Sequence, residues 1–432
     1  MKALVITTVL VLAVSAVPAQ SMFGGNPAHT GVATSAAPRT APGVKWIFPT
    51  GARIVGSAVW YEGAVIFGSD DGHVYAVDAA SGRQRWMHRT DGPVPATPAV
   101  HGGTVYVPSY DGRLHAIDAA TGELRWTYAT GGERRFEARG LHGLQPRSQT
   151  IADMYDVYLS SPVVAQGAVI FGSGDGHVHA VDADTGRERW RFRTGDVVHA
   201  SPAYADGMVY VGSWDGRLYA LDAATGAQRW MFQAGVDALM ANQQGFQSSP
   251  AVVDGVVYTG CRDSHVYALD ARTGAERWRY STGASWVNAT PAVQGGRVHA
   301  ATSDSSLYLV LDAASGRLVH QHSTQSYVFA SPVIAGDVVL VGVLNGVLQA
   351  RDRASGALLW AFQTEASRAN RGWVLTADRA FNGRLLFPDG GHDTAVIGAA
   401  RQWSTGSFFA TPLVVDGVIY LGSADGRLYA LG

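Results

Sequence analysis

Two histidines placed two residues apart are the first groups in this sequence that could do chemistry. His177 and His179 would face the same side of a strand, because side chains alternate across it, and paired imidazoles are common metal ligands. They follow an Asp-Gly turn, so we interpret them as ordinary alternating positions and expect no metal site. His320 and His322 stand where similar stretches of the chain have tryptophan, which indicates degenerate packing.

Motifs of known catalytic chemistry do not accompany these histidines. The sequence has no Gly-x-Ser-x-Gly nucleophile motif, no phosphate-binding glycine loop and no zinc pattern of cysteines. Cys261 is the only cysteine, which excludes an internal disulfide, and we expect it to be a small buried residue. A net charge of -2 gives no basic footprint for nucleic acid. We therefore expect neither a catalytic set nor a nucleic-acid partner.

Candidate binding residues lie in four segments that interrupt a regular sequence, at 131–160, 234–248, 283–289 and 364–410. These segments combine arginines, amides and aromatic residues that could bind an anionic or sugar-like ligand, or a peptide. The candidates are Arg134, Arg135, His142, Asp156, Tyr158, Asn242, Gln244, Trp286, Asn288, Arg371 and Trp373. The alternative is that these loops pack on one another and fill the mouth of the fold, because long loops need polar partners of their own.

The elements that would position these segments are internal repeats. Residues 72–86 read GHVYAVDAASGRQRW, and residues 112–126 repeat this stretch closely; further copies end at Trp190, Trp230, Trp278 and Trp360, and a weaker copy ends at His320. Trp86 and Trp126 are 40 residues apart. Repeats of that length with four strand signals each are typical of propeller blades. One aspartate recurs in each repeat and is expected to accept backbone hydrogen bonds at the next turn: Asp78, Asp118, Asp182, Asp222, Asp270, Asp312 and Asp352.

Eight such units predict an all-β, eight-bladed propeller of four-stranded antiparallel blades. The unit opened by Ser201 illustrates the pattern, with strands expected at 208–213, 217–222 and 228–233. Units begin near Ser57, Thr97, Ser161, Ser201, Ser249, Thr290, Ser331 and Thr411. The strand-like residues 384–387 and Trp403 raise the possibility of a ninth blade. That tract lacks the repeated motif, so we interpret 364–410 as an insertion that is partly helical.

The two ends of the repeat array are expected to pair. The last unit stops after three strands at Leu431, and residues 45–48 can supply the missing fourth strand. Closure would remove the open sheet edges that promote aggregation. All four interrupting segments are connections between blades, so they should lie on one face together with the Asp-Gly turns. Loops on a rigid scaffold commonly carry binding, and this face is the candidate functional surface.

The N-terminus has the pattern of a secretory signal. Lys2 precedes an apolar run at 3–14 that is short for a transmembrane helix, and small residues at 17–19 would allow cleavage before Gln20. We expect a signal peptide at 1–19, a lead-in segment at 20–44 and the propeller at 45–432. A periplasmic or secreted location follows, with no transmembrane segment after signal removal. No cysteine follows the cleavage point directly, so no lipid anchor is expected there.

The repeats also resemble a known family. The motif Ala76-x-Asp78-x-x-Ser81-Gly82-x-x-x-Trp86 and its copies resemble the tryptophan-docking motif of quinoprotein-type propellers. Residues 23–31, FGGNPAHTG, resemble the lead-in of pyrroloquinoline-quinone-like repeat proteins. The resemblance covers nearly the whole mature chain. It implies that one tryptophan per blade packs between neighbouring blades, and the docking residues would be Trp46, Trp86, Trp126, Trp190, Trp230, Trp278 and Trp360.

This resemblance is informative about fold rather than activity. The fold serves quinoprotein alcohol dehydrogenases and also the non-enzymatic outer-membrane assembly factor BamB. The dehydrogenases have an adjacent cysteine pair beside the quinone, which Cys261 alone cannot form, and their calcium ligands and catalytic aspartate cannot be placed residue by residue on this sequence. The assembly factor resembles a lipid-anchored protein, whereas no anchor cysteine is present here.

We therefore favour a non-enzymatic binding or scaffold protein of the periplasm. It would be a monomer without a cofactor and would present the loop-rich face to a protein, peptide or glycan of the cell envelope. The role could resemble that of the assembly factor. The alternative is an oxidoreductase or sensor that binds pyrroloquinoline quinone with calcium. Trp286 and Trp373 motivate it, because an aromatic side chain near the mouth could stack on a planar ring.

Overall fold

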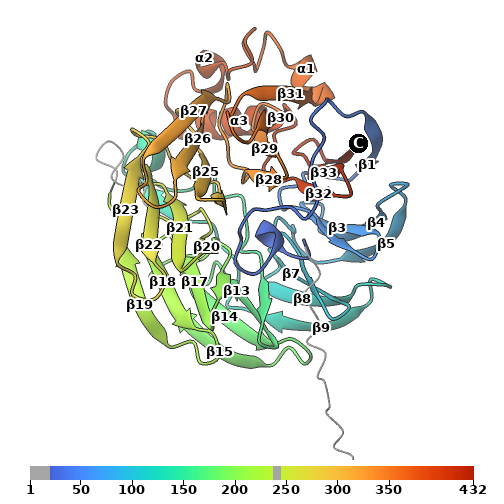
Figure 1. Cartoon of the computed structure of the whole chain (residues 1–432), viewed down its shortest axis with the longest axis vertical. Coiled ribbons are helices and arrows are strands. Elements are labelled where there is room, and N and C mark those ends of the chain that lie inside the picture. The colour runs from blue at the N-terminus through green and yellow to red at the C-terminus, as the bar shows by residue number, and fades with distance from the viewer. Residues whose placement is uncertain (1–19, 237–244) are drawn as a thin grey trace, which may run out of the picture.

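The computed structural model describes residues 20–236 and 245–432 and shows eight antiparallel four-stranded sheets arranged in a ring (Figure 1). The prediction of an all-β, eight-bladed propeller is confirmed. The expected signal peptide at 1–19 and the candidate residues Asn242 and Gln244 lie outside the described residues. Among the helices of the described part, none has the length and apolar character needed to cross a bilayer.

Blades 1 to 4 follow one another around the ring, each with its strands in sequence order. Blade 1 contains β2 (Val59–Tyr61), β3 (Ala64–Ser69), β4 (His73–Asp78) and β5 (Gln84–Arg89). Blade 2 contains β6 (Ala99–His101), β7 (Thr104–Ser109), β8 (Arg113–Asp118) and β9 (Leu124–Ala129). Blade 3 contains β12 (Val163–Ala165), β13 (Ala168–Gly172), β14 (His177–Asp182) and β15 (Glu188–Arg193). Blade 4 contains β16 (Ala203–Ala205), β17 (Met208–Gly212), β18 (Arg217–Asp222) and β19 (Gln228–Gln233).

Blades 5 to 8 complete the ring. Blade 5 contains β20 (Ala251–Val253), β21 (Val256–Cys261), β22 (His265–Asp270) and β23 (Glu276–Ser281). Blade 6 contains β24 (Ala292–Gln294), β25 (Arg297–Ala301), β26 (Leu307–Asp312) and β27 (Leu318–Ser323). Blade 7 contains β28 (Val333–Ala335), β29 (Val338–Val343), β30 (Val347–Asp352) and β31 (Leu358–Gln363). Blade 8 contains β32 (Leu413–Val415), β33 (Val418–Gly422), β34 (Arg427–Leu431) and, as its outermost strand, β1 (Val44–Pro49).

The β1–β34 pair closes the ring as the sequence predicted. Trp46 pairs with Ala430 and Phe48 with Leu428 in an antiparallel register. The third and fourth strands of blade 8 therefore come from opposite ends of the repeat array. No turn connects these two strands, whereas a turn connects the third and fourth strands of every other blade. Blade 8 lacks such a turn to receive Trp360, and the indole N–H of Trp360 donates instead to the carbonyl of Pro38 in the lead-in segment, at 2.9 Å.

The repeated aspartate fixes the turn before each fourth strand. In blade 1, one carboxylate oxygen of Asp78 accepts from the backbone N–H of Ser81 at 2.9 Å and the other from Arg85 at 2.8 Å. Together with the neighbouring serine hydroxyl, these donors hold the pKa of Asp78 at about 2. Gly82 follows with a φ of +70°, a conformation that glycine adopts without strain. A Cβ at Gly82 would lie 2.7 Å from the ring of Trp46, so this glycine also leaves room for the indole of the preceding blade.

A closed ring of hydroxyl groups surrounds the axis. The Ser or Thr that opens each blade accepts a hydrogen bond from the backbone N–H of the corresponding residue one blade earlier. The bonds measure 2.8–3.2 Å. The ring runs Ser57, Thr97, Ser161, Ser201, Ser249, Thr290, Ser331, Thr411 and back to Ser57. The recurring Ser/Thr-Pro signal is thus explained by a hydrogen bond that joins neighbouring blades.

The lead-in segment closes one end of the axis with backbone hydrogen bonds to the innermost strands. Carbonyls of residues 20–31 accept from the second residue of the first strand in six blades, and the side chain of Gln20 bonds the carbonyl of Val414 in a seventh. The backbone donors are Trp60, Val100, Tyr204, Val252, Val293 and Ile334. His29 is buried here, with its Nδ1 atom 3.2 Å from the carbonyl of Pro250. Burial lowers the pKa of His29 to about 4.

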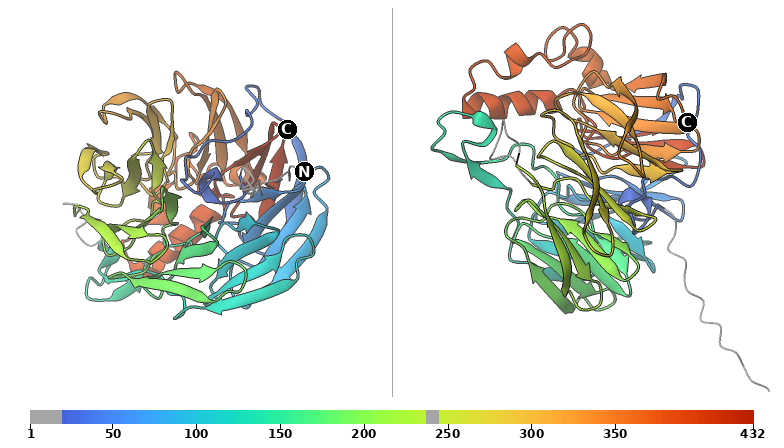
Figure 2. Two further views of the ribbon diagram at one scale, coloured as in Figure 1. Left: turned by 60° about the horizontal axis from the view of Figure 1, so that its bottom comes forward. Right: turned by 60° about the vertical axis from the view of Figure 1, so that its left-hand side comes forward.

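The long segments at 131–160 and 364–410 project from the opposite face of the ring, as the right-hand view of Figure 2 shows. The first contains β10 (Glu137–Arg139), η2 (Leu141–Gly143) and β11 (Thr150–Ala152), and the second contains α1 (Glu365–Ala369), α2 (Gly383–Leu386) and α3 (His392–Trp403). Another short helix, η1 (Phe23–Gly25), belongs to the lead-in. The strand-like impression of residues 384–387 was wrong, because residues 384–386 lie in α2. This helix packs against α3 and belongs to none of the sheets of the described residues.

Candidate functional site

The segments 131–160 and 364–410 pack on each other over the mouth of the ring, and we call them together the cap. Gln145 bonds the backbone of Gly390, and the hydroxyl of Tyr155 donates to Gln402 at 3.0 Å. A continuous apolar cluster joins the cap to the blades; it includes Phe136, Leu141, Met154, Trp286, Phe329, Ala395 and Phe409. The cap is therefore a packed structure with its own core.

A buried arginine lies at the centre of this core. Arg262, at the start of the turn after β21, is 0% exposed, and its guanidinium group lies between two indoles. Its Cζ atom is 4.3 Å from the ring centroid of Trp214 and 4.1 Å from that of Trp286, which are cation–π contacts. The guanidinium also donates to the buried carboxylate of Asp153. It donates as well to the side-chain oxygen of Gln247, at 2.6 Å.

Asp153 connects this arginine to the cap. Its carboxylate also accepts from the backbone N–H of Tyr155 at 2.8 Å and lies 3.0 Å from Nε2 of His142. Burial by itself would raise the pKa of this carboxyl group. The charges of Arg262 and His142 overcome that effect and hold the pKa of Asp153 well below its ordinary value. A buried charge that is paired and fully hydrogen-bonded in this way fixes the cap on the blades.

A second buried ion pair lies nearby. His199, in the connection between blades 3 and 4, has its Nδ1 atom 2.7 Å from Asp156, and its Nε2 atom is 3.7 Å from the carboxylate of Glu133. Burial opposes the charged imidazole, but the two carboxylates raise the pKa of His199 to about 10. Asp156 additionally accepts from the backbone N–H of Phe136 at 2.7 Å. The ends of segment 131–160 are therefore held by charges inside the protein.

An aromatic pocket opens between the two parts of the cap and blade 6. Its volume is about 290 Å³, and its walls include His142, Tyr155, Trp286, Tyr327, Phe329 and Phe387. Asp304, an exposed carboxylate in the turn after β25, lies at its rim. Beside this pocket, α3 exposes Val396 and Ile397, with 42% and 51% of their surfaces accessible. This is the concave, largely apolar surface on the loop-rich face that could accept a side chain of another molecule.

The candidates from sequence do not form one group in the structure. His142 and Trp286 line the aromatic pocket, whereas Arg134 pairs with Asp196 at 2.8 Å on the surface. Arg135 lies near Tyr110 and Asp70 at the edge of the cap. Arg371 and Trp373 are exposed and form hydrogen bonds within their own insertion. Arg371 donates to the carbonyl of Ala377, and the carbonyl of Trp373 accepts from the side chain of Asn382.

Three further candidates are internal. Asp156 is buried in the ion pair with His199, and Tyr158 donates to the carbonyl of Phe409 at 3.1 Å. Tyr158 and Asn288 both line a small cavity on the axis, of about 40 Å³, bounded by the hydroxyl ring. Neither amide atom of Asn288 has a hydrogen-bond partner among the described residues. The size and polarity of this cavity suit an ordered water rather than a ligand.

Sequence reasoning missed Arg262 and Trp214, which organise the cap core. Both occupy the same position, the turn residue that follows the second strand, in blades 5 and 4. Each of these turn residues donates its backbone N–H to a carbonyl of the connection entering the blade. Seven blades share this bond, from Asp70, Tyr110, Trp214, Arg262, Ser303, Leu344 and Ala424, whereas Gly174 of blade 3 donates to the carboxylate of Glu133. The sequence signal that could have identified them is the variability of this turn residue between blades, since the residues around it are repeated.

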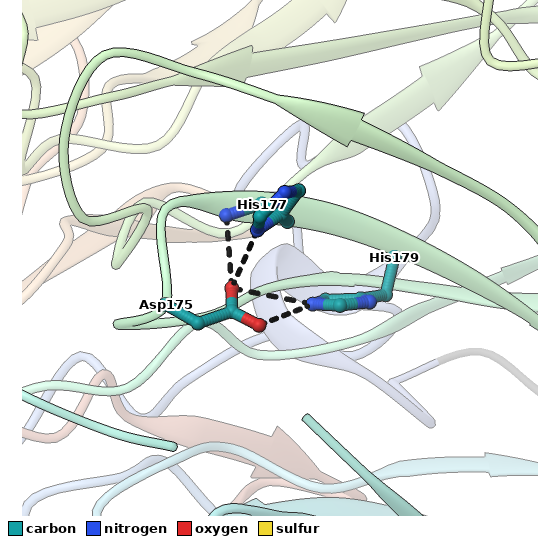
Figure 3. Close-up of side chains that lie close together, drawn as sticks. All are labelled: Asp175, His177 and His179. Carbon is teal, nitrogen blue, oxygen red and sulfur yellow. Dashed lines mark hydrogen bonds and ion pairs between the residues drawn. The ribbon is translucent and has the colours of Figure 1, made fainter. Parts of the chain in front are cut away.

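Asp175, His177 and His179 lie close enough together to hold a metal ion, as Figure 3 shows. The same geometry recurs without histidine in other blades. Asp71 and Tyr75 bond at 2.8 Å, and Asp215 and Tyr219 at 2.6 Å. His179 takes the place of that tyrosine: its Nε2 atom bonds Asp175 and its Nδ1 atom lies 3.1 Å from the hydroxyl of Tyr128. Both ring nitrogens are therefore engaged in a structural turn motif.

The residues at the mouth do not fit a quinone in the manner of the quinoprotein dehydrogenases. One ring face of Trp286 is covered by Arg262 of this chain. Cys261 has Arg262 as its neighbour, and its buried Sγ lies 3.3 Å from the carbonyl of Gly245. Trp373 is 54% exposed on the outer insertion. These side chains offer no paired stacking surface.

Comparisons with known proteins agree with this geometry. The family model described as outer membrane protein assembly factor BamB matches residues 33–156, 144–282 and 240–431. The outer membrane protein assembly factor BamB of Moranella endobia (strain PCIT) is 29% identical over 153 residues, which cover 32% of this chain and 39% of that protein. The matched stretch therefore spans about two fifths of the relative's length.

Solved structures show the same fold. BamB from Moraxella catarrhalis superposes with a TM-score of 0.66 and 17% identity, covering 90% of this chain and 99% of that one. A quinohemoprotein alcohol dehydrogenase from Comamonas testosteroni gives a TM-score of 0.67 and 16% identity, covering 96% of this chain and 80% of that one. At these identities the likeness concerns the propeller itself and does not separate a binding protein from an enzyme.

Proposed function

The chain belongs to the family of outer membrane protein assembly factor BamB, and from that premise we propose that it is a non-enzymatic propeller of the cell envelope. It binds a protein or peptide through the loop-rich face, in a role related to outer-membrane protein assembly. Residues 1–19 serve as its export signal in this proposal.

The observation that carries the proposal is the aromatic pocket beside the exposed face of α3. The charged groups of the cap core are paired with groups of the same chain, which supports a structural role for them. The cap exposes charged residues such as Arg147 and Asp393, but the side chains gathered around its concavity are apolar: the pocket walls, Val396, Ile397 and Trp373. Apolar side chains gathered around a concavity are typical of protein-binding surfaces. Asp304 at the rim favours a partner with a basic residue next to an apolar one.

The test is capture of envelope proteins by the purified, tagged chain, with the captured proteins quantified by mass spectrometry. Ile397→Asp places a charge on the proposed surface and should reduce capture of the principal partner at least tenfold. Met87→Asp is the matched control, because Met87 is 47% exposed on β5, an outer strand, and should leave capture unchanged. Equal capture by the two variants would contradict the proposal.

Two further measurements separate this proposal from its alternatives. A glycan array should give no signal that depends on Ile397. Addition of micromolar pyrroloquinoline quinone with calcium should give no visible spectral change and no dye-linked alcohol oxidation, since Arg262 covers one ring face of Trp286. Sequencing of the mature N-terminus tests the export signal, with Gln20 expected as the first residue.

A further inference from the structure

The joint between blades 6 and 7 differs from the other joints of the ring. At a typical joint, the indole N–H of a tryptophan donates to the carbonyl that follows the repeated aspartate of the next blade, as Trp278 does to Ala313 at 2.9 Å. At this joint, His320 replaces the tryptophan and Arg353 replaces the alanine. An imidazole is smaller than an indole, and a cavity of about 580 Å³ lies between the two blades.

A third substitution converges on the same cavity. His299 on β25 takes the position that is tyrosine in blades 2, 4, 5 and 8, namely Tyr106, Tyr210, Tyr258 and Tyr420. Each of those hydroxyls donates to a backbone carbonyl of the next blade, for example Tyr258 to Ala313 at 3.3 Å. Within the described residues, His299 makes no such bond. In other blades these three positions are apolar or carry a side chain that bonds the backbone of the next blade. At this joint they are His299, His320 and Arg353, and all three line one cavity.

His299, which lines the cavity, carries an unused hydrogen-bond donor. The residue is fully buried, and its Nδ1 atom lies 2.6 Å from the hydroxyl of Tyr308. That hydroxyl has no other acceptor among the described residues, so we assign its proton to this bond, which leaves Nε2 as an N–H donor. Nε2 has no partner in the described part of the chain. A buried donor without a partner is rare in native proteins and indicates a missing acceptor.

The charges around the cavity favour an anion as that acceptor. Arg353 donates to the carbonyl of Gly336 at 3.3 Å and forms no ion pair within the described residues. Two of the nearby carboxylates are already engaged: Asp352 pairs with Arg39 at 2.9 Å and accepts from its own turn, and Asp312 pairs with Arg297 at 2.8 Å. Asp337 is exposed at the edge. An unpaired guanidinium and a buried N–H therefore share one cavity.

We propose that this cavity binds a small molecule carrying an oxyanion, either a carboxylate or a phosphate group, held by Nε2–H of His299 and by the guanidinium group of Arg353. Arginine suits both groups because its N–H donors match two anionic oxygens at once. The volume is within the range of small-molecule sites and exceeds that of a bare phosphate, so an organic anion fits. The site lies in a blade joint away from the cap and does not depend on the partner-binding proposal.

The test is calorimetric titration of the purified full chain with inorganic phosphate, with citrate and with chloride at one ionic strength. We expect submillimolar, one-to-one binding of phosphate or citrate and none of chloride; the anion that binds identifies the group recognised. If neither binds more tightly than chloride, the proposal is overturned.

Variants assign the binding to this joint. Arg353→Ala and His299→Tyr introduce residues that other blades carry at the same positions, so both should fold, and either should weaken binding at least tenfold. Arg272→Ala is the matched control, since it removes one positive charge from the exposed turn of blade 5. An equal loss in Arg272→Ala and Arg353→Ala would show general charge attraction and would overturn the assignment.

Discussion

The two ends of the propeller axis are closed by different means. The lead-in segment at one end is held by backbone hydrogen bonds to the innermost strands of most blades. The cap at the other end is held by side chains: a guanidinium between two indoles, two buried ion pairs and an aromatic core. Backbone bonds depend little on which residues make them, whereas the cap depends on particular ones. The structure of the cap is therefore more sensitive to sequence change than that of the lead-in.

The largest expected effect comes from removing the cap's central cation. Arg262→Met leaves the buried carboxylate of Asp153 without its main counter-charge, and we expect the free energy of unfolding in urea to fall by about 3–5 kcal/mol. Arg277→Met is the control, because Arg277 pairs with Asp270 on the exposed surface and should cost less than about 1 kcal/mol. A loss in Arg262→Met as small as that in the control would show that the ion pair does not hold the cap.

The two ends should respond to pH in opposite directions. At the cap, the pKa of His199 is about 10, above its ordinary value of 6.5. Its contribution to the free energy of unfolding is therefore complete below pH 6.5 and is lost as the pH rises toward 10. At the lead-in, the pKa of His29 is about 4, so the unfolded chain takes up this proton more readily than the folded one. The free energy of unfolding is therefore unaffected by His29 above pH 6.5 and decreases as the pH falls toward 4. A tenfold difference in proton affinity between the folded and unfolded chain corresponds to about 1.4 kcal/mol of stability.

Urea unfolding from pH 4.5 to 9.5 measures both effects. His199→Gln should remove the stability loss on the alkaline side, and His29→Gln should remove the loss on the acid side, with a slope change of about 1 kcal/mol per pH unit in each case. Each variant serves as the control for the other. Parallel curves for the wild type and both variants would contradict the opposed roles.

The smallest expected effect is at the lead-in. Thr30→Ala keeps the backbone carbonyl that accepts from Val293, so we expect a loss of free energy of unfolding below about 1 kcal/mol. Gly31→Val alters the adjacent backbone, where φ is +68° and a Cβ would lie 2.6 Å from that of Ala292; it should cost more than Thr30→Ala, by about 2 kcal/mol. A larger loss in Thr30→Ala than in Gly31→Val would show that side chains hold this end as well.

Sequence alone predicted the blades well because their determinants are local. The strands expected at 217–222 and 228–233 are β18 and β19 with the same bounds, since alternation, turn glycine and the aspartate lie within a few residues of one another. The pairing of β1 with β34 was also predictable, because a blade with three strands requires a fourth. Repeated units carry this information many times over.

The cap could not be predicted in the same way. Tyr155 bonds Gln402, which lies 247 residues further along the chain, and Arg262 bonds Asp153 across 109 residues. Such partners are set by the closed ring, which brings the connections of distant blades to one place. Residues chosen only for binding chemistry, such as Asp156 and Tyr158, are occupied internally. Residues that the repeat pattern concealed, such as Trp214, form the core.

The joining of β1 to β34 has a consequence for the order of folding. These two strands lie at opposite ends of the repeat array, and the hydroxyl ring likewise closes through a bond between Thr411 and Ser57. Contacts this distant in sequence form slowly. The other blades can therefore form before the shared blade does, and ring closure is expected to be a late step of folding.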